Sequence, residues 1–514
     1  MKAFLLILCQ VVCGLAAARA AEDKPPTVTQ KLAGLLTAAG QDGKPVISSE
    51  QRAYFDSLNG LIKGLLSNVV EREIITKPDH LASVLALGLQ PQKMELLLLD
   101  NCVLCHTDPE VQKPGSLFSL SPAAGPPAPR LSLRDMVEDV HFRRGVSCAG
   151  CHGGDPANDK LEHSFVPEWP GTGRDKNRAW IAAFCARCHS DPTLMNRFNP
   201  ALPTDQLSKF KASPHGKLLL EGNDPRAPQC VSCHGVHGIR NSKNPFSLVH
   251  RKRVPETCAV CHADAKTMAG FKRPDGSPMP TNQLAEYRGS VHGRALLERG
   301  DLGAPACNNC HGNHSAMPVG LSSVSQSCGL CHAGNASLFD GSNHKLAFEK
   351  HQWPQCGQCH GSHGIAKPHD LLLSPRPDSL CTRCHNEFAK EKPECNGTAA
   401  FFYSSITNLD RSWSAIGATV EQLAAKGLDV DPMHDQLNEL ADSLKQARTH
   451  IHSFNKVSFQ RVADPGEKAI QTVSSLIQDA RREYRVRQTG LVASIALLGL
   501  LMLALYLKLR SLEQ

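Results

Sequence analysis

The five-residue pattern Cys-x-x-Cys-His occurs nine times between residues 102 and 385. Two residues always separate the cysteines, and a histidine always follows the second cysteine. Any fold of this chain must therefore place nine groups of two thiols and one imidazole. The residues of these motifs are Cys102, Cys105, His106; Cys148, Cys151, His152; Cys185, Cys188, His189; Cys230, Cys233, His234; Cys258, Cys261, His262; Cys307, Cys310, His311; Cys328, Cys331, His332; Cys356, Cys359, His360; and Cys381, Cys384, His385.

This arrangement suits a flat cofactor that is held from two directions. Two thiols can form thioether bonds to the vinyl groups along one porphyrin edge, and the adjacent histidine then binds iron from the proximal side. Zinc sites also use Cys-x-x-Cys pairs, but neither they nor disulfides require a histidine directly after the second cysteine. The motifs therefore predict nine covalently attached haem c groups.

The density of the motifs predicts how the chain folds. Each haem has about 32 residues, too few to surround every haem with a pocket of its own. The haems must then pack against one another and form much of the core, which agrees with an aromatic content of only 5%. We expect a mainly α fold with much irregular coil, in which short helices surround the motifs.

Histidines outside the motifs are candidates for the sixth iron ligand, and bis-histidine ligation suits electron transfer. Besides the predicted ligands named below, His250 and His369 are alternative candidates, and His80 is a further candidate for the first haem. In the third repeat described below, either His344 or His351 takes the upstream role. The predicted ligands are His141, His163, His215, His237, His292, His314, His344, His351 and His363.

The chain also repeats internally. Ser213-Pro-His-Gly precedes a Cys-x-x-Cys-His-Gly-x-His segment that begins at Cys230, and Ser290-Val-His-Gly precedes another at Cys307. A shorter third copy pairs Ser342-Asn-His-Lys with the segment at Cys356. Each copy is followed by a simple motif, so the repeating unit is a pair of motifs with two extra histidines.

Apolar segments lie at both ends of the chain. Residues 1–20 read as a signal peptide with a cleavage site at Ala18-Arg19-Ala20, and residues 489–508 are long enough to cross a bilayer as one helix. More basic residues precede the second segment than follow it, which alone favours the reverse orientation. The signal peptide favours an exported chain on the periplasmic face of the inner membrane.

Between these ends we predict three regions. Residues 21–100 form a helical region, with one helix starting at Ser48-Ser49-Glu50-Gln51, and residues 101–390 form the nine-haem cytochrome domain. Residues 399–488 form a stalk of three antiparallel helices. Proline signatures place the starts of its second and third helices at Asp431-Pro432 and Asp464-Pro465.

Residues 141–385 resemble multihaem cytochromes c of the tetrahaem cytochrome and octahaem hydroxylamine oxidoreductase superfamily. The resemblance rests on the paired motifs, on Cys-x-x-Cys-His-Gly-x-His and on the upstream Ser-x-His-Gly. It implies stacked haem pairs and a C-terminal helical bundle. Members that reduce nitrite or tetrathionate carry lysine in place of the motif histidine at the active haem, and no Cys-x-x-Cys-Lys occurs in this chain.

These features predict an electron carrier rather than an enzyme. Its expected partners are a quinol oxidoreductase or b-type cytochrome subunits, soluble c-type cytochromes and, through the C-terminal helix, the membrane. The net charge of +7 does not indicate a nucleic-acid partner, because haem propionates add negative charge. The alternative is an oxidoreductase for a small nitrogen or sulfur compound, with the haem at Cys102 open. We expect His434, His450 and His452 on helix surfaces and Cys395 as an inert thiol.

Overall fold

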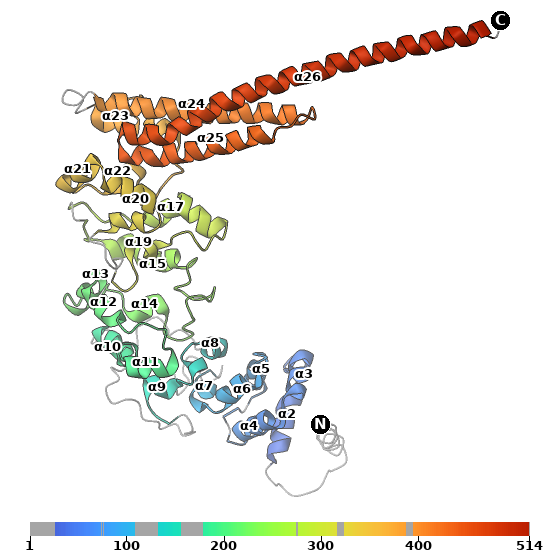
Figure 1. The fold of residues 1–514 in the computed structure, drawn as a ribbon. Helices are drawn as coiled ribbons and strands as arrows, with labels where there is room; N and C mark the ends of the chain where they lie inside the picture. Colours follow the sequence, from blue (N-terminus) through green and yellow to red (C-terminus); the bar gives the residue numbers. More distant parts are fainter. Residues whose placement is uncertain are drawn as a thin grey trace. The chain divides into compact units, whose positions relative to one another are not determined.

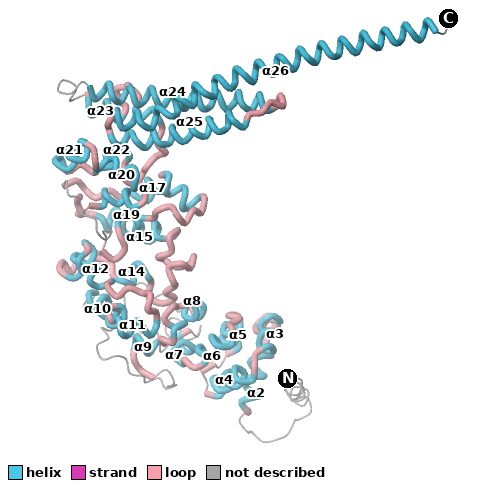
Figure 2. The backbone as a smooth tube through the Cα atoms, in the orientation of Figure 1, coloured by secondary structure: helices cyan, strands magenta, loops and turns pink. Residues whose placement is uncertain are grey.

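The computed structural model describes residues 26–72, 74–75, 77–107, 132–155, 178–273, 276–315, 323–386 and 394–512. The predicted signal peptide and His163 lie outside these ranges. The described residues are mainly helical with long irregular connections, and they contain isolated bridges but no strand (Figures 1 and 2). This confirms the predicted mainly α class.

The chain divides into two compact units. One comprises Met1–Thr281 with Ala306–Asn308 and Gly312–Ala316, and the other comprises Asn282–Pro305, Asn309–His311 and Met317–Gln514. The elements outside the C-terminal bundle are α2 (Val28–Thr37), α3 (Ser49–Ser57), α4 (Gly60–Glu71), α5 (Pro78–Leu85), α6 (Pro91–Leu98), α7 (Asn101–His106), α8 (Leu133–Glu138), η1 (Phe142–Arg144), α9 (Cys148–His152), α10 (Arg178–His189), α11 (Pro192–Phe198), α12 (Gln206–Ala212), α13 (Pro214–Leu220), α14 (Cys230–His234), α15 (Val254–His262), α16 (Ala265–Met268), α17 (Gln283–Gly289), α18 (Val291–Gly293), η2 (Arg294–Glu298), α19 (Cys307–His311), η3 (Val324–Leu330), α20 (Ala333–Asp340), α21 (Asn343–His351), α22 (Gln355–His360), η4 (Asp370–Leu373) and α23 (Leu380–His385).

The helices α2 to α8 form a conventional apolar core. Ser48 caps α3 and exchanges bonds with Gln51 in a capping box, which confirms the predicted helix start. Leu66, Leu81 and Leu104 are fully buried in one cluster that extends from α4 to the helix of the first motif. This core therefore supports the first haem-binding motif from one side.

Most motifs lie at the end of a short helix, so each histidine is close to the helix C-terminus. After the fourth and eighth motifs, Gly235 and Gly361 have φ of 84° and 77° with ψ of 178°. Only glycine readily adopts this conformation. The glycine in Cys-His-Gly turns the chain away from the helix and starts the return towards the next histidine.

The Ser-x-His-Gly segments form tight corners between two helices. Ser213 donates from its hydroxyl to the carbonyl of Phe210 and accepts from the amide of Gly216, at 2.7 and 2.9 Å. A Cβ on Gly216 would lie 1.8 Å from the Phe210 carbonyl oxygen, so only glycine fits. Ser290 makes the same two bonds in the second copy. The corner fixes the histidine at the start of the second helix.

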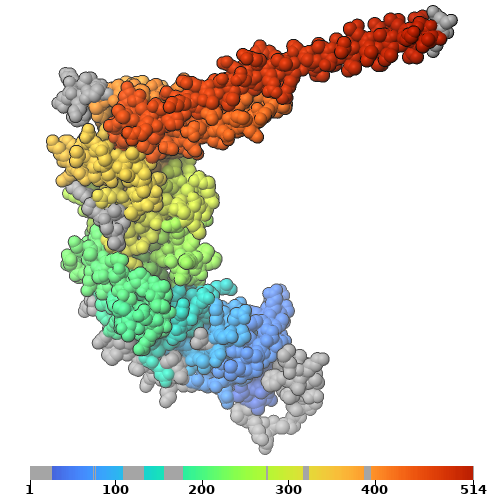
Figure 3. All heavy atoms as spheres, in the orientation of Figure 1, coloured from blue at the N-terminus to red at the C-terminus, as the bar shows by residue number. Residues whose placement is uncertain are grey.

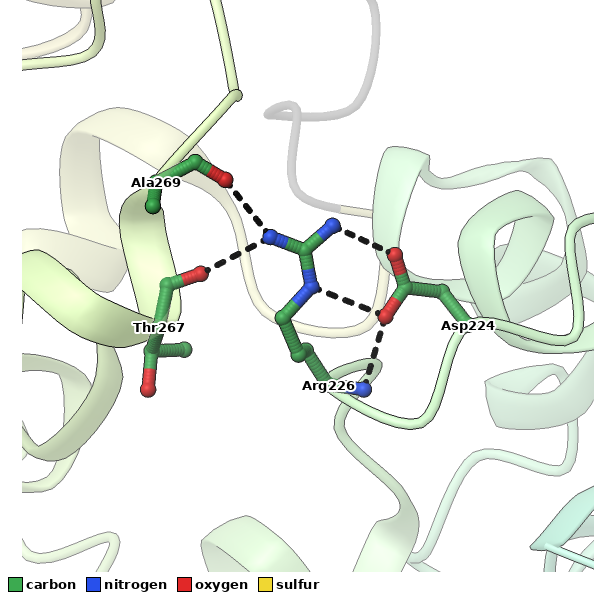
Figure 4. Close-up of polar contacts among 4 residues, drawn as sticks. All are labelled: Asp224, Arg226, Thr267 and Ala269. Atoms are coloured by element: carbon green, nitrogen blue, oxygen red, sulfur yellow. Dashed lines mark hydrogen bonds and ion pairs between the residues drawn. The ribbon is translucent and has the colours of Figure 1, made fainter.

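An arginine clamp holds the segment before the fourth motif to the helix after the fifth. Arg226 pairs with Asp224 through two nitrogens and donates to the carbonyls of Thr267 and Ala269, at 3.3 and 2.7 Å (Figure 4). Its guanidinium also lies over the ring of Phe271. Gly303 stands at the corresponding position of the second repeat, so this clamp belongs to the first repeat.

The C-terminal bundle consists of α24 (Glu394–Ala424), α25 (Asp431–His450), the η5 turn (Ile451–Ser453) and α26 (Lys456–Leu512), with the three helices side by side in Figure 1. Ile406, Leu440 and Phe459 are fully buried where the helices meet. The predicted start of α25 at Asp431 is confirmed.

The predicted start of the last helix at Pro465 is wrong, because α26 begins at Lys456 and Pro465 lies inside it. Ser443 of α25 stabilises this interruption. Its hydroxyl donates to the carbonyl of Val462 at 2.5 Å and accepts from the amide of Gly466 at 3.1 Å. It thereby bridges a donor and an acceptor that would otherwise bond to each other within the helix. A proline and a glycine are tolerated here because a neighbouring helix completes the bonding.

The C-terminal part of α26 extends beyond the bundle as an exposed rod (Figure 3). Its apolar window has a mean hydropathy of 2.4 and is not buried within the structure, with Leu498 and Met502 60% and 69% exposed. Within the described part of the chain, α26 is long and apolar enough to cross a membrane, judged by length and composition.

Candidate haem sites

In the described part of the chain, the histidines of the second to the ninth motif each face a second histidine. The ring centroids of these eight pairs are 5.8 to 6.3 Å apart. In motif order from the second to the ninth, the pairs are His152–His237, His189–His141, His234–His314, His262–His215, His311–His363, His332–His292, His360–His452 and His385–His344.

These distances fit two imidazoles on opposite sides of one iron. A metal–nitrogen bond of about 2 Å and a ring nitrogen about 1.1 Å from the ring centre put the two centres roughly 6 Å apart. The interplanar angle is free in such a site, since each ring can rotate about its own bond to the metal. The observed angles range from 12° to 85°, whereas the distances hardly vary.

Direct ring stacking does not explain the pairs. The rings of His234 and His314 are almost parallel, at 12°, but their centroids are 6.1 Å apart. By contrast, Trp180 and Phe184 stack in direct contact at 17° and 4.6 Å. The additional space between the two histidine rings is what a planar cofactor bound between them requires.

The pairing follows a rule along the chain. The histidine of each Cys-His-Gly-x-His segment faces the motif two positions earlier, so His237 of the fourth motif faces His152 of the second. His314 and His363 repeat this arrangement. The upstream histidine of each repeat, such as His215, faces the simple motif that ends the same repeat. Each repeat therefore supplies ligand positions to its neighbours as well as to itself.

Polar groups orient several of the facing rings. Nδ1 of His141 lies 3.1 Å from the Asp139 carboxylate, which also accepts from the amides of His141 and Ile239, at 2.8 and 2.6 Å. Burial acts to raise the pKa of Asp139, but hydrogen bonds from His141 and Ile239 bring it below the usual value. Glu286 lies further from Nδ1 of His363, at 3.9 Å. Such partners fix which ring nitrogen is left to bind a metal.

Burial keeps many of these imidazoles neutral. It lowers the pKa of both rings in four pairs, with the neighbouring histidine adding to the effect at His152 and His234. The largest shift brings the pKa of His344 to about 4. A neutral imidazole has the free electron pair that metal binding needs.

Cysteines of successive motifs lie next to each other. The thiols of Cys185 and Cys230, first cysteines of the third and fourth motifs, are hydrogen-bonded, as are Cys258 with Cys307 and Cys328 with Cys356. Between these pairs, second cysteines of successive motifs lie close together. Burial raises the pKa of Cys151, and the nearby Cys188 thiolate raises it further. Burial and the nearby Cys261 thiolate raise the pKa of Cys233 in the same way. Cys384 acts on Cys359 in the same way. First and second cysteines thus alternate in these contacts from the second to the sixth motif, whereas Cys310 of the sixth motif lies near the first cysteine of the seventh, Cys328.

The structure accounts differently for the remaining histidines. Of the predicted ligands, His351 is exposed and stacks on Trp353 at 4.9 Å, while His344 faces His385. His163 lies outside the described residues. His452 faces His360, although we expected it on a helix surface and not as a ligand. In this sequence no Cys-His-Gly-x-His segment lies two motifs after the eighth. This exception to the repeat could have indicated that the eighth motif takes its second histidine from outside the motif region.

A zinc cage does not fit these residues. Zinc sites gather about four ligands around one point. Across the described ranges, no group of three or more His, Cys, Asp and Glu side chains converges in that way. Paired imidazoles beside paired thiols match the donor set of haem c instead.

Comparisons with known proteins agree with this interpretation. Residues 223–267 and 349–390 match the family described as Doubled CXXCH motif. The chain is 26% identical over 186 residues to the multiheme cytochrome MtrA of Shewanella baltica, covering 34% of this chain and 46% of that protein. It is 24% identical over 200 residues to the C-type polyheme cytochrome OmcC of Geobacter sulfurreducens, covering 35% of this chain and 23% of that protein. No solved structure matches the chain.

The chain therefore spans less than half the length of either relative. The paired motifs and these relatives support a multihaem c-type cytochrome with covalently bound haem c.

Proposed function

We propose that the chain carries nine haems in sequence order as one electron-transfer series on the periplasmic face of the membrane. A haem bound at each site would supply one-electron exchange between ferric and ferrous iron. The observation that carries the proposal is the set of eight histidine pairs about 6 Å apart. Histidines on both sides would leave no position for a substrate on these eight irons, which favours a carrier for motifs two to nine.

The order of the series follows from the cysteines. The hydrogen bond between the thiols of Cys185 and Cys230 brings together the attachment points of consecutive motifs. Cys233 and Cys261 do the same for the next two motifs. Motifs two to six and the eighth use one cysteine towards the preceding motif and the other towards the following motif. In the seventh motif Cys328 lies near both Cys310 and Cys356. The haems would then follow one another in sequence order.

Two histidines predicted from the sequence are candidates for the sixth ligand of the first haem, His163 and His80, and His80 is buried on α5. His106, the proximal histidine of this haem, is held at the end of α7 by the N-terminal apolar core.

The exposed apolar rod of α26 would anchor the chain in the membrane, with the bundle and haems outside. Because the bundle of this anchor lies against the last two motifs, these motifs would be the ones that exchange electrons with a membrane quinol-oxidising system. Other cytochromes or a terminal reductase would be the second partner.

Two measurements on the haem-loaded protein test this function. Carbon monoxide added to the reduced protein should bind none of the haems, whereas binding to one or more would support the open-haem alternative. A chain ending at residue 488 should carry the same number of haems but appear in the soluble periplasmic fraction. Recovery of that shortened chain in the membrane would contradict anchoring by α26.

A further inference from the structure

The η5 turn of the bundle lies against the last two motifs. His452 faces His360 of the eighth motif with ring centroids 6.1 Å apart. Phe454, two residues later, packs on His344 at 3.7 Å, and His344 faces His385 of the ninth motif. These residues all belong to the same compact unit. One turn of the bundle therefore contacts both of the last two sites.

His452 is held in the tautomer that a metal ligand requires. Its Nδ1 lies 2.9 Å from the carbonyl oxygen of Thr449. A carbonyl only accepts hydrogen bonds, so Nδ1 carries the proton and Nε2 keeps its electron pair. A bond from the second ring nitrogen to a backbone carbonyl is a common feature of metal-bound histidines.

The repeat explains why a residue outside the motif region is needed. His237, His314 and His363 each face the motif two positions before their own. By this rule the eighth motif would take its second histidine from a motif after the ninth, and residues 386–514 contain no further Cys-x-x-Cys-His. His452 stands at the position that the missing repeat would have supplied.

We propose that the bundle is an integral end cap of the haem series, in which His452 supplies the sixth ligand of the eighth haem. The inference rests on the proposed bis-histidine ligation and extends it to the bundle. Phe454 covers the distal ligand of the ninth haem from the same turn. The membrane anchor and the last two haems are thereby joined in one structural element.

An ion-pair network holds the turn in place. Arg448, four residues before His452, bonds to both carboxylate oxygens of Asp370 at 3.1 and 2.7 Å and to Asp410 at 3.0 Å. Asp370 lies in η4, after the eighth motif, and Asp410 lies on α24. The end of α25 is therefore fixed to the segment that follows the motif it serves.

The test uses the full-length, haem-loaded protein in detergent. His452→Ala should convert one haem in nine to a high-spin form that binds carbon monoxide when reduced, and added imidazole should restore the low-spin spectrum. His450→Ala is the matched control, because its ring bonds to Ser458 in the same segment and should leave every haem low-spin. An unchanged spectrum in His452→Ala, or an equal change in His450→Ala, would overturn the inference.

Two further variants keep the result interpretable. If His452→Ala does not accumulate, His452→Met should retain six-coordinate haem but raise the midpoint potential of one haem, since methionine is the weaker donor to ferric iron; no shift would count against the inference. His363→Ala should open the sixth haem. If it does and His452→Ala does not, only the end cap fails. If neither opens a haem, the proposed bis-histidine ligation fails as well.

Discussion

Nδ1 of His141 lies 3.1 Å from the carboxylate of Asp139, whose side chain is only 7% exposed. A carboxylate at this position increases the electron density that the ring donates to a metal, which stabilises ferric iron. We predict that Asp139→Asn raises the midpoint potential of one haem, the third. About 1 kcal/mol of lost interaction corresponds to roughly 40 mV for one electron.

Glu286→Gln provides the comparison for that prediction. Glu286 lies 3.9 Å from Nδ1 of His363 and its side chain is 44% exposed, so the loss of its charge should shift one potential by less. Spectroelectrochemical titration of both variants measures the two shifts. A larger shift in Glu286→Gln than in Asp139→Asn would show that these carboxylates do not tune the haems through the facing histidines.

The sixth ligand of the first haem gives a second prediction. If His163 or His80 supplies it, one of the variants His163→Ala and His80→Ala should create a single haem that binds carbon monoxide. The other variant should leave all haems low-spin, although His80→Ala should in either case lower the melting temperature, because His80 is buried. Carbon monoxide binding in neither variant would contradict a ligand role for this pair of candidates.

A third prediction concerns the glycine of Cys-His-Gly. Gly235 has φ of 84° and ψ of 178°, and a Cβ there would meet only ordinary contacts. The cost of Gly235→Ala is therefore backbone strain, about 1–3 kcal/mol. Because the strain displaces His237, the second haem should lose its second histidine in part of the molecules, visible as a high-spin fraction.

Gly64→Ala is the control for this effect. Gly64 lies inside α4 with nothing near its Cβ position, so alanine should stabilise the helix by about 0.5–1 kcal/mol. Thermal unfolding of the two variants should shift in opposite directions. Shifts of the melting temperature in the same direction and of the same size would mean that the positive φ of Gly235 does not require glycine.

A fourth prediction concerns the bond of Ser443 to α26. Ser443→Ala leaves the carbonyl of Val462 and the amide of Gly466 without their bridging hydroxyl in a buried site, so unfolding of the bundle should become easier by about 1–3 kcal/mol. Ser474→Ala removes a hydroxyl bonded within its own helix and should change stability by less than about 0.5 kcal/mol. Thermal unfolding followed by circular dichroism measures both variants. Equal melting temperatures for Ser443→Ala and Ser474→Ala would refute the role of Ser443.

Local signals in the sequence predicted much of this structure. The motifs, the start of α3 at Ser48 and the start of α25 at Asp431 follow from residues within a few positions of each other. The candidate ligand of each repeat could also be identified, because His237, His314 and His363 occupy the same position in the repeated sequence Cys-x-x-Cys-His-Gly-x-His. Where the residues of a site are adjacent in the sequence, the site can be predicted without knowledge of the tertiary structure.

Contacts between distant residues could not be predicted in this way. His234 and His314 are far apart in the sequence, and many pairings satisfied the same count of histidines. The start of α26 was misplaced because Ser443, on another helix, compensates for Pro465. His452 was missed because its role depends on how the bundle packs against the eighth motif.

The central claim is that nine haems are bound, each between two histidines. Haem iron per chain, measured together with the intact mass of the protein, tests the number, and the low-temperature electron paramagnetic resonance spectrum tests the ligation. The account predicts nine haems per chain and only low-spin ferric signals. Fewer than nine haems, or a high-spin signal equivalent to one haem or more, would contradict it.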